Sequence, residues 1–320
     1  MNCVLVGNYG VGNLGDEALR EYFLQEFPSV DWAVLSAKPE KAGYARLPAG
    51  LRSFLSLQWV RTIGVFWQTD VVVFGGGSLF TDVESPYACF LWWVHAFVAV
   101  LFNKPFALAF QGIGPFHTKR GEWFARWTVR RASFISVRDE ESAARIETWR
   151  KSTKIVQTFD PIFSLLYNKK TTISSQNVFI IIPRKNSSKS FLQSVQNEIK
   201  SKKWEEVKVL LMEPENKNEQ EIAQAILSMS DAQVEVLPVT SIDSLVTAIQ
   251  NANIVYTQRF HGAIAALALG VPVEIFPQGA GDKLAGLIPY AKDPEKLDEL
   301  ERRCANGQKM LEAWLSGKRS

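Results

Sequence analysis

The stretch Gly7-Asn8-Tyr9-Gly10-Val11-Gly12-Asn13-Leu14-Gly15-Asp16-Glu17 follows a short apolar run, residues 3–6, and leads into a helical pattern that begins at Ala18. A strand, a glycine-rich turn and a helix in this order are typical of the carboxyl edge of a parallel sheet. Ligands bind at that edge in open α/β proteins. The chain is therefore predicted to begin with a βα unit that faces a ligand.

Within this stretch, residues 10–15 carry the G-x-G-x-x-G spacing of dinucleotide-binding loops. Two features argue against a dinucleotide. Asp16 and Glu17 stand at the helix start, where they would repel a pyrophosphate. The next expected strand, residues 32–35, lacks the acid at its carboxyl end that would hold a ribose. We predict instead a turn capped by Asn13 or Asp16, or a loop whose backbone approaches another ligand.

Composition limits the class of protein. A length of 320 residues favours about two domains, and an apolar fraction of 47% supplies two ordinary cores. The net charge of +3 is too small to indicate a nucleic-acid partner. Three scattered cysteines predict no disulfide framework, so we expect a reducing cytoplasm. The apolar run at residues 88–102 falls short of the roughly 18 residues of a membrane span and contains His95, which predicts a buried helix with a core histidine.

Strands and helices alternate along the chain. In the first half, the expected strands are residues 3–6, 32–35, 71–74, 106–110, 134–137 and 155–159. In the second half, they are residues 178–182, 207–212, 233–237, 254–257 and 271–276. Helical patterns fill the gaps, which predicts βαβ units and parallel sheets.

We therefore expect an α/β fold of two Rossmann-like domains whose parallel sheets face each other across a cleft, the GT-B-like layout. The predicted domains are residues 1–167 and 177–320, joined by a polar linker at residues 168–176. The last helix, around residues 294–315, is predicted to pack back on the first domain.

A second block, Gln258-Arg259-Phe260-His261-Gly262, stands between an expected strand and a helix rich in small residues. Arg259 and His261 are two residues apart, so both side chains can face the same space. His261 lies near a helix amino terminus, whose positive field disfavours the imidazolium and suits an acid–base group. A histidine that caps or bridges within the core is the structural alternative.

Basic residues near expected strand ends are candidates for binding an anion: Arg138, Arg184, Arg259 and Lys283. Arginine pairs with carboxylate or phosphate in bidentate fashion, and lysine acts as a point charge. Arg138 is either half of a structural ion pair or a ligand clamp. A solvated surface position is the alternative for Arg184. The dispersed histidines and the lack of an acid cluster predict no metal site.

Six motifs, taken in order, resemble those of the polysaccharide pyruvyl transferase family. They are Gly7-Asn8-Tyr9-Gly10-Val11-Gly12-Asn13-Leu14-Gly15-Asp16-Glu17-Ala18, Gly75-Gly76-Gly77-Ser78-Leu79, Gln111-Gly112-Ile113-Gly114-Pro115, Val137-Arg138-Asp139-Glu140-Glu141-Ser142, Asp160-Pro161 and Arg259-Phe260-His261. The family usually has leucine where this chain has Phe260, a change of bulk and not of charge.

This resemblance implies a transferase that moves pyruvate from phosphoenolpyruvate, a co-substrate, to a sugar and forms a cyclic ketal. The acceptor would be a cell-surface polysaccharide or its lipid-linked oligosaccharide precursor, and no cofactor is expected. His261 and Asp16 are the catalytic candidates; the choice of base among Asp16, Glu17 and Asp82 is left open. The donor's anionic groups would meet Arg138, Arg184, Arg259 and Lys283. The residues expected to line the acceptor site are Gly10, Asn13, Glu17, Gly76, Gly77, Ser78, Asp82 and Gln111.

Two alternatives are kept open: a GT-B glycosyltransferase with a nucleotide-sugar donor, and a non-catalytic scaffold of polysaccharide assembly. The first would usually present acids to the donor, where this chain has Arg259, His261 and Lys283. The helix expected at residues 121–131 mixes tryptophan with arginine, which is compatible with a membrane interface. Solvated arginines on a packed helix are the alternative. Peripheral association with the inner face of the cell membrane is thus a further hypothesis.

Overall fold

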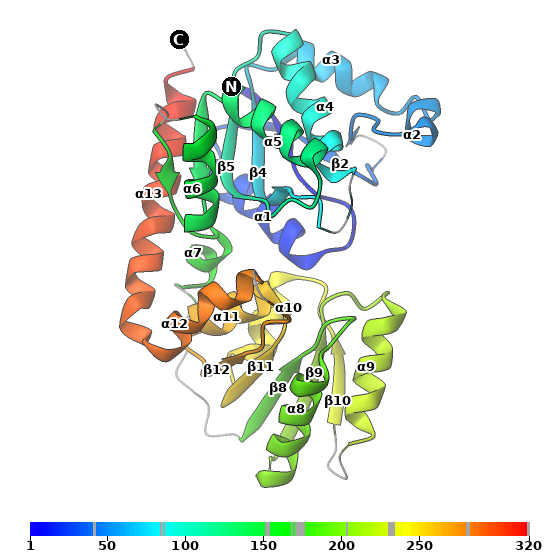
Figure 1. The fold of residues 1–320 in the computed structure, drawn as a ribbon, viewed down its shortest axis with the longest axis vertical. Helices are drawn as coiled ribbons and strands as arrows, with labels where there is room; N and C mark the ends of the chain where they lie inside the picture. Colours follow the sequence, from blue (N-terminus) through cyan, green and yellow to red (C-terminus); the bar gives the residue numbers. More distant parts are fainter. Residues whose placement is uncertain are drawn as a thin grey trace. The chain divides into compact units, whose positions relative to one another are not determined.

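The computed structural model describes residues 1–40, 43–83, 85, 87–150, 154–167, 169, 177–202, 204–229, 234–279 and 282–318. The chain forms two α/β units, each built on a parallel sheet (Figure 1). The first unit comprises Met1–Val11, Leu19–Pro161 and Arg302–Ser320, and the second comprises Gly12–Ala18 and Ile162–Glu301. Of the predicted linker at residues 168–176, all but Lys169 lie outside the described residues.

The first unit contains a seven-stranded sheet in the order β3-β2-β1-β4-β5-β6-β7. Its strands are β1 (Asn2–Val6), β2 (Asp31–Ser36), β3 (Tyr44–Ala45), β4 (Val71–Phe80), β5 (Phe106–Ile113), β6 (Phe134–Val137) and β7 (Val156–Gln157). The helices between them are α1 (Leu14–Glu26), α2 (Leu51–Leu55), α3 (Val60–Gln68), α4 (Ala88–Leu101), α5 (Lys119–Arg131) and α6 (Glu140–Trp149). The strand order reverses between β1 and β4, which is where such sheets bind ligands.

Both faces of this sheet are covered, as a parallel sheet requires. On one face, Val4, Val72 and Phe74 share a core with side chains of α3, α4, α5 and α6. On the other face, the rings of Tyr22 and Phe23 in α1 lie 5.6 and 6.1 Å from the ring of Phe110. The strands are apolar on both faces for this reason.

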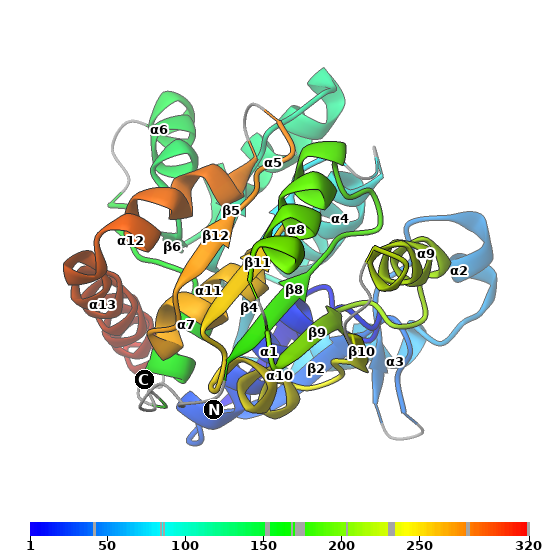
Figure 2. The same cartoon turned by 90° about the horizontal axis from the view of Figure 1, so that it is seen from below.

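The second unit contains a five-stranded sheet in the order β10-β9-β8-β11-β12. Its strands are β8 (Val178–Ile182), β9 (Glu206–Leu211), β10 (Val234–Pro238), β11 (Ile254–Thr257) and β12 (Val273–Ile275). Its helices include α7 (Ile162–Tyr167), α8 (Lys189–Ser201), α9 (Lys217–Leu227), α10 (Ile242–Ile249), α11 (Phe260–Leu269) and α12 (Ile288–Lys292). Phe179 and Ile181 pack with α8 and α9, whereas Ile182 meets α11 on the opposite face (Figure 2).

The long helix α13 (Leu297–Ser316) contributes to both units. Its residues from Arg302 onward belong to the first unit. Thr158 Oγ1 donates to the Arg303 carbonyl at 3.0 Å, and the ring of Trp314 lies 5.9 Å from that of Phe134. These contacts attach the carboxyl-terminal part of α13 to the edge of the seven-stranded sheet.

Two strands continue past residues 74 and 110, where we expected them to end, into the glycine-containing motifs that follow. β4 continues through Gly75-Gly76-Gly77-Ser78 to Phe80, and β5 continues to Ile113. Gly76 and Gly77 have φ values of +79° and +80°, a region that glycine enters without steric penalty. The register between β4 and β5 shifts after Gly77, so pairing resumes past a bulge. The expected ends of these strands were wrong, because the apolar runs stop where the bulge begins whereas the pairing between the strands continues past it.

No helix among the described residues is long and apolar enough to cross a membrane. Most of the apolar run at residues 88–102 forms α4, and His95 is fully buried there, as predicted. His95 Nδ1 lies 2.8 Å from the Leu91 carbonyl, and Nε2 accepts the Leu47 N–H at 2.9 Å. Both ring nitrogens are thus satisfied by a neutral imidazole, and burial lowers the pKa of His95 to about 4.

This buried imidazole makes stability depend on pH. The unfolded chain protonates His95 near its ordinary pKa of 6.5, whereas the folded chain does so only near 4. The unfolded state therefore binds more protons in this window, and the free energy of unfolding should fall by about 3 kcal/mol as pH drops through it. Urea titrations at several pH values measure the slope. His95→Gln should reduce it, and the surface variant His117→Gln should not; equal slopes in all three proteins would contradict the assignment.

Candidate functional site

The carboxyl end of β11 places Arg259, Phe260 and His261 at the start of α11. Thr257 Oγ1 accepts the Arg259 N–H at 3.0 Å and donates to the Arg259 carbonyl at 3.2 Å, which fixes the turn. A Cβ at Gly262 would lie 2.9 Å from side-chain atoms of both Ile182 and Thr257, so glycine lets α11 lie close to the sheet. His261 therefore occupies the first turn of a tightly packed helix.

The imidazole of His261 packs against the backbone of Gly15, in the first turn of α1. A Cβ at Gly15 would lie 1.9 Å from Cε1 and 2.0 Å from Nδ1 of His261. Because Gly12–Ala18 belongs to the second unit, the two most informative sequence motifs meet within one unit. The last glycine of the G-x-G-x-x-G spacing thus makes room for a histidine of the same protein.

Asn13, Asp16 and Glu17 lie within two residues of Gly15, which contacts His261. Asn13 Oδ1 accepts the Gly15 N–H at 3.1 Å, so Asn13 caps the helix, one of the two capping residues predicted for this turn. Asp16 and Glu17 are half-buried in the first turn, where the helix dipole favours negative charge. Asp16 follows Gly15 directly, which brings a carboxylate to the turn that touches the imidazole.

Phe260 connects His261 to Lys283, which begins the short 3₁₀ helix Lys283–Leu287. Lys283 Nζ lies 4.6 Å from the centre of the Phe260 ring, a cation–π distance. The Phe260 ring meets the His261 ring edge to face, with centres 5.5 Å apart. Phe260, the residue that departs from the family pattern, therefore contacts both Lys283, a predicted donor-binding cation, and His261, a predicted catalytic residue.

Arg184 lies at the carboxyl end of β8 and is half-buried. Its Nη1 lies 3.4 Å from Gln278 Oε1, and Gln278 Nε2 donates to the Asn186 carbonyl at 2.8 Å. This position is at the same sheet edge as Arg259, because β8 and β11 are adjacent parallel strands.

Arg259, one of the cations expected at the donor, is held by two carboxylates in this structure. Its Nη1 lies 2.7 Å from Glu213 Oε1, and its Nη2 lies 2.5 Å from Glu219 Oε1. Its Nε donates to the Pro183 carbonyl at 3.3 Å. Two negative charges surround one positive charge, so these three side chains carry a net charge of −1.

The pKa values follow from this arrangement. Burial acts to lower the pKa of Arg259, but the charge of Glu219 and the hydrogen bonds to both acids outweigh it and raise that pKa. Burial acts to raise the pKa of Glu213, but the hydrogen bond and charge of Arg259 outweigh it and hold that pKa below its usual value. Arg259 thus ties the ends of β8 and β9 to the start of α11, where it fixes the helix that carries His261.

In the first unit, Arg138 is half of a buried ion pair. Its Nη1 lies 2.5 Å from Asp160 Oδ2, and its Nη2 donates to Ser78 Oγ at 2.7 Å. Arg138 is 5% exposed and Asp160 is fully buried, so the charge of Arg138 is matched within the unit. A Cβ at Gly112 would lie 2.8 Å from Ser78 Oγ and 3.2 Å from Arg138 Nε, which explains that glycine. Of the two roles predicted for Arg138, the structure shows the ion pair.

Asp82, expected beside the acceptor, binds the chain's own backbone. Its Oδ1 accepts the His117 N–H at 2.6 Å, and its Oδ2 accepts both the N–H and the hydroxyl of Thr118. Burial acts to raise the pKa of Asp82, but these hydrogen bonds outweigh it and keep that pKa below its ordinary value. Thr118 in turn caps α5, so this carboxylate organises the helix start.

The glycine-rich ends of β1 and β4 enclose Tyr9. The Tyr9 ring is buried, and its hydroxyl donates to the Gly75 carbonyl at 2.9 Å. A Cβ at Gly7 or Gly75 would lie within 2.6 Å of Tyr9 atoms, whereas one at Gly10 would lie 2.1 Å from Ser36 Oγ. These glycines accommodate side chains of the protein.

Gln111, Gly76 and Gly77 are buried in the sheet. The Gln111 amide donates to the carbonyls of Phe74, Gly76 and Ala109, which holds the bulged end of β4 in place. Ser78 is half-buried and bound by Arg138. Each residue of the β4 and β5 motifs that was predicted to line the sugar-acceptor site has a contact within the fold.

Tyr9, Glu213 and Glu219 are among the residues of these networks that were not predicted. Glu213 lies two residues after the end of β9, and an acid near a strand end is a signal that the sequence offers. Glu219 lies within α9, and its full burial could not be read from its position. Among the described residues, no cluster of three His, Cys, Asp or Glu side chains could hold a metal ion.

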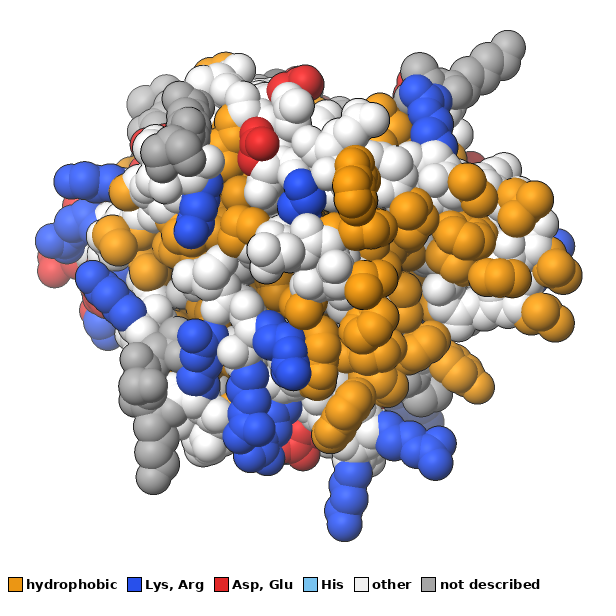
Figure 3. Space-filling view, turned by 90° about the horizontal axis from the view of Figure 1, so that it is seen from above, with side chains coloured by type: hydrophobic (Ala, Val, Ile, Leu, Met, Phe, Trp, Pro, Cys, Tyr) orange, Lys and Arg blue, Asp and Glu red, His pale blue; other side chains and the backbone are white. Residues whose placement is uncertain are grey.

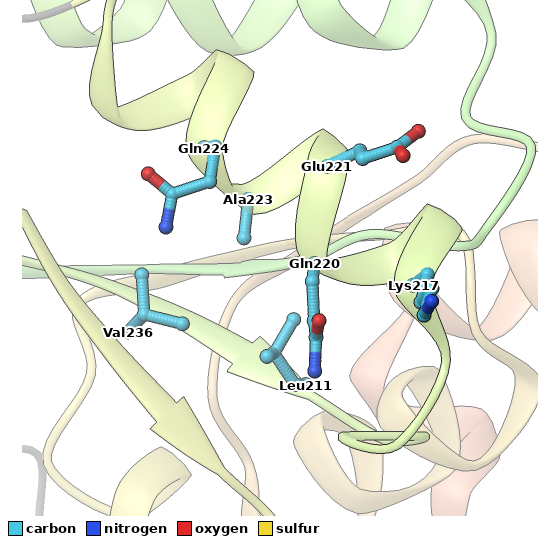
Figure 4. Close-up of a pocket in the computed structure, with 7 residues that line it drawn as sticks. All are labelled: Leu211, Lys217, Gln220, Glu221, Ala223, Gln224 and Val236. Carbon is cyan, nitrogen blue, oxygen red and sulfur yellow. The ribbon is translucent and has the colours of Figure 1, made fainter.

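A separate hollow of about 510 Å³ lies between α9 and the strands β9 and β10. Gln220 and Gln224 extend from α9 toward Leu211 and Val236, as Figure 4 shows. None of the residues that line it belongs to the Arg259 or His261 networks, so it is not part of the candidate site.

The chain is similar in sequence to a known family and to a curated protein. Residues 13–276 match the family model described as "Polysaccharide pyruvyl transferase". The amylovoran biosynthesis protein AmsJ of Erwinia amylovora is 24% identical over 206 residues, which cover 51% of this chain and 49% of that protein. The match thus spans about half the length of this curated relative.

Solved structures share the fold. HepE of Anabaena, crystallised with UDP, aligns with a TM-score of 0.59 and 12% identity over 99% of this chain and 100% of its own. The UDP-GlcNAc 2-epimerase of Neisseria meningitidis aligns with a TM-score of 0.57 and 14% identity over 99% and 100%. MurG of Acinetobacter baumannii aligns with a TM-score of 0.50 and 10% identity over 96% and 94%. These likenesses confirm the predicted α/β, GT-B-like fold class.

The Arg138–Asp160 pair gives a test of stability. Asp160→Asn leaves the buried guanidinium without its counter-charge and should lower the free energy of unfolding by about 3–5 kcal/mol. Asp293→Asn, which breaks the exposed pair with Lys296, is the matched control and should change it by less than about 1 kcal/mol. Chemical denaturation measures both. Equal small losses would show that Arg138 gains little from Asp160.

The Gly15–His261 contact gives a second test. Gly15→Ala introduces a methyl group at the position of the imidazole and should displace the ring. The ¹H–¹³C NMR signal of the His261 ring, assigned through His261→Gln, should shift while the other histidine signals stay in place. Gly64→Ala, where a Cβ meets nothing within 4 Å, is the control. An unmoved His261 signal in Gly15→Ala would contradict the contact.

Proposed function

Since the chain belongs to the polysaccharide pyruvyl transferase family, we propose that it transfers pyruvate from phosphoenolpyruvate to a sugar of a polysaccharide or its lipid-linked precursor. The product is a cyclic ketal bridging two hydroxyls of the sugar. The observation that carries the proposal is the packing of the His261 imidazole on Gly15, next to Asp16 and within contact of the Phe260 ring that Lys283 covers.

The proposed reaction needs one proton delivered and two removed. One sugar hydroxyl attacks C2 of the enol ester and loses its proton, while the methylene carbon gains a proton and becomes a methyl group. The second hydroxyl then attacks the same carbon and loses its proton, and phosphate leaves with its bonding electrons. The products are the ketal, which keeps the carboxylate, and inorganic phosphate.

His261 is proposed to deliver the proton to the methylene carbon or the departing phosphate. Asp16 is proposed to accept a proton from the sugar, because it follows the glycine that touches the imidazole. A proton donor and a carboxylate at one turn suit a reaction that adds and removes protons at neighbouring atoms. Glu17, in the same turn, is proposed to bind the sugar hydroxyls.

The donor's negative charges are proposed to bind Lys283 and Arg184. Arg259 is instead proposed as a positioning residue, since Glu213 and Glu219 already neutralise it and hold the start of α11. Arg138 has its counter-charge in Asp160. This assignment reduces the expected set of four donor cations to two.

A nucleotide-sugar donor is the second candidate function. It is favoured by the half-buried carboxylate of Glu213 after β9, since acids commonly bind the hydroxyls of a ribose. HepE was solved with UDP, although its identity of 12% supports the fold alone.

Activity tests the role of His261. Incubation with phosphoenolpyruvate and a panel of glycans should release phosphate and add the mass of a pyruvyl ketal to one of them. His261→Ala should lower turnover by roughly 10²-fold or more, because general acid–base help of that size is lost. His117→Ala, an exposed histidine on the other unit, should leave turnover unchanged. Near-normal turnover of His261→Ala in a folded protein would exclude the proposed role.

Thermal unfolding separates the two donors. A ligand that binds only the folded state raises its melting temperature by mass action. Phosphoenolpyruvate should raise that temperature in the wild type and less in Lys283→Gln. A shift with UDP-sugars and none with phosphoenolpyruvate would favour the second candidate function, whatever the glycan panel shows.

A further inference from the structure

Helices α2, α3, α4 and α5 of the first unit leave large apolar side chains in solvent. The large apolar side chains exposed on these helices include Leu51, Leu55, Trp67, Phe97, Leu101 and Trp123. Trp67 is 68% exposed, Leu101 is 65% exposed and Trp123 is 53% exposed. We call the surface formed by these six residues the α2–α5 face. Large apolar patches on a water-soluble surface mark a site of interaction.

Aromatic contacts join α3, α4 and α5 of this face. The ring of Trp67 in α3 lies 5.5 Å from that of Phe102, which follows α4. The ring of Trp93 in α4 lies 5.2 Å from that of Phe97 and 6.2 Å from that of Trp123 in α5. α4 itself contains no charged residue, although its outer side is exposed at Phe97 and Leu101. Figure 3 shows hydrophobic side chains gathered on the face that it views, with Lys and Arg at their border.

The charges on the helices of the α2–α5 face are almost all positive. Residues 41–69 and 85–121 contain no Asp or Glu. The exposed cations on the same helices are Arg52, Arg61, Arg120, Arg126, Arg130 and Arg131, joined by Lys119. Glu122 is the one acid in these four helices. A partner of this surface therefore has to offer an apolar interior and a negatively charged border.

We propose that the α2–α5 face binds a lipid bilayer that contains anionic headgroups. Tryptophan and leucine side chains would enter the boundary between headgroups and acyl chains, and the arginines would lie at the phosphates. A second copy of this chain fits less well, because a two-fold contact would bring the same cations together. The inference concerns a surface and does not depend on the proposed reaction.

Sedimentation with vesicles tests this proposal. The wild type should pellet with vesicles of phosphatidylcholine and phosphatidylglycerol in equal parts, and far less with phosphatidylcholine alone. Trp67→Gln/Leu101→Gln should weaken the binding by about tenfold or more, because two large apolar side chains no longer enter the lipid. Leu24→Gln, an exposed leucine on α1, is the matched control and should bind as the wild type does.

The charge dependence is tested in the same assay. Arg52→Gln/Arg126→Gln should weaken binding to the anionic vesicles by about fivefold for each charge removed, and added salt should weaken it further. Lys309→Gln, exposed on α13, is the control. Circular dichroism and melting curves show whether each variant is folded.

Three outcomes would overturn the proposal. The first is that the wild type does not pellet with the anionic vesicles. The second is binding that the Trp67→Gln/Leu101→Gln variant retains in full. The third is a wild-type dimer in sedimentation equilibrium that this variant abolishes, which would assign the α2–α5 face to a second copy of the chain.

Discussion

The structure depends on glycines, which have no side chain, within β4 and β5, directly after β1 and in the first turn of α1. Gly7 and Gly75 leave the space that Tyr9 fills, Gly112 leaves space for Arg138 and Ser78, and Gly15 leaves space for His261. In each case the side chain that enters is polar or carries a polar end. The glycine-rich motifs thus allow polar groups to be packed at the sheet edge without a cavity.

The same packing explains how charge is distributed. Arg138 and Arg259 are both largely buried, and both have carboxylates within hydrogen-bond distance. A buried guanidinium requires such a partner, because an uncompensated charge in the interior is costly. Burial and direct binding of an external anion therefore compete for the same arginine. Lys283 differs from both arginines, because it is exposed and its ammonium group lies over the Phe260 ring.

The fold could be predicted from the sequence to a large extent, and the site only in part. Continuous apolar runs, separated by helical patterns, predicted the positions of all the long strands, because parallel strands are buried on both faces. They failed at Tyr44–Ala45, a strand of two residues, and at the bulged ends of β4 and β5. His261 and its neighbours were chosen as candidates from their expected position after a strand, and the structure places them there. The pairing of Arg259 with Glu219 joins residues 40 positions apart, and no local pattern carries such information.

The division of the chain into two discontinuous units limits the order in which its parts can fold. Neither unit is one continuous run of sequence. Gly12–Ala18 lies between two segments of the first unit but belongs to the second, and Arg302–Ser320 follows the second unit but belongs to the first. A fragment that stopped at Pro161 would retain all seven strands of its sheet, yet it would uncover Phe134 and lack the Arg303 carbonyl to which Thr158 donates. The amino-terminal half therefore cannot complete its native packing on the ribosome until the final helix has been synthesised.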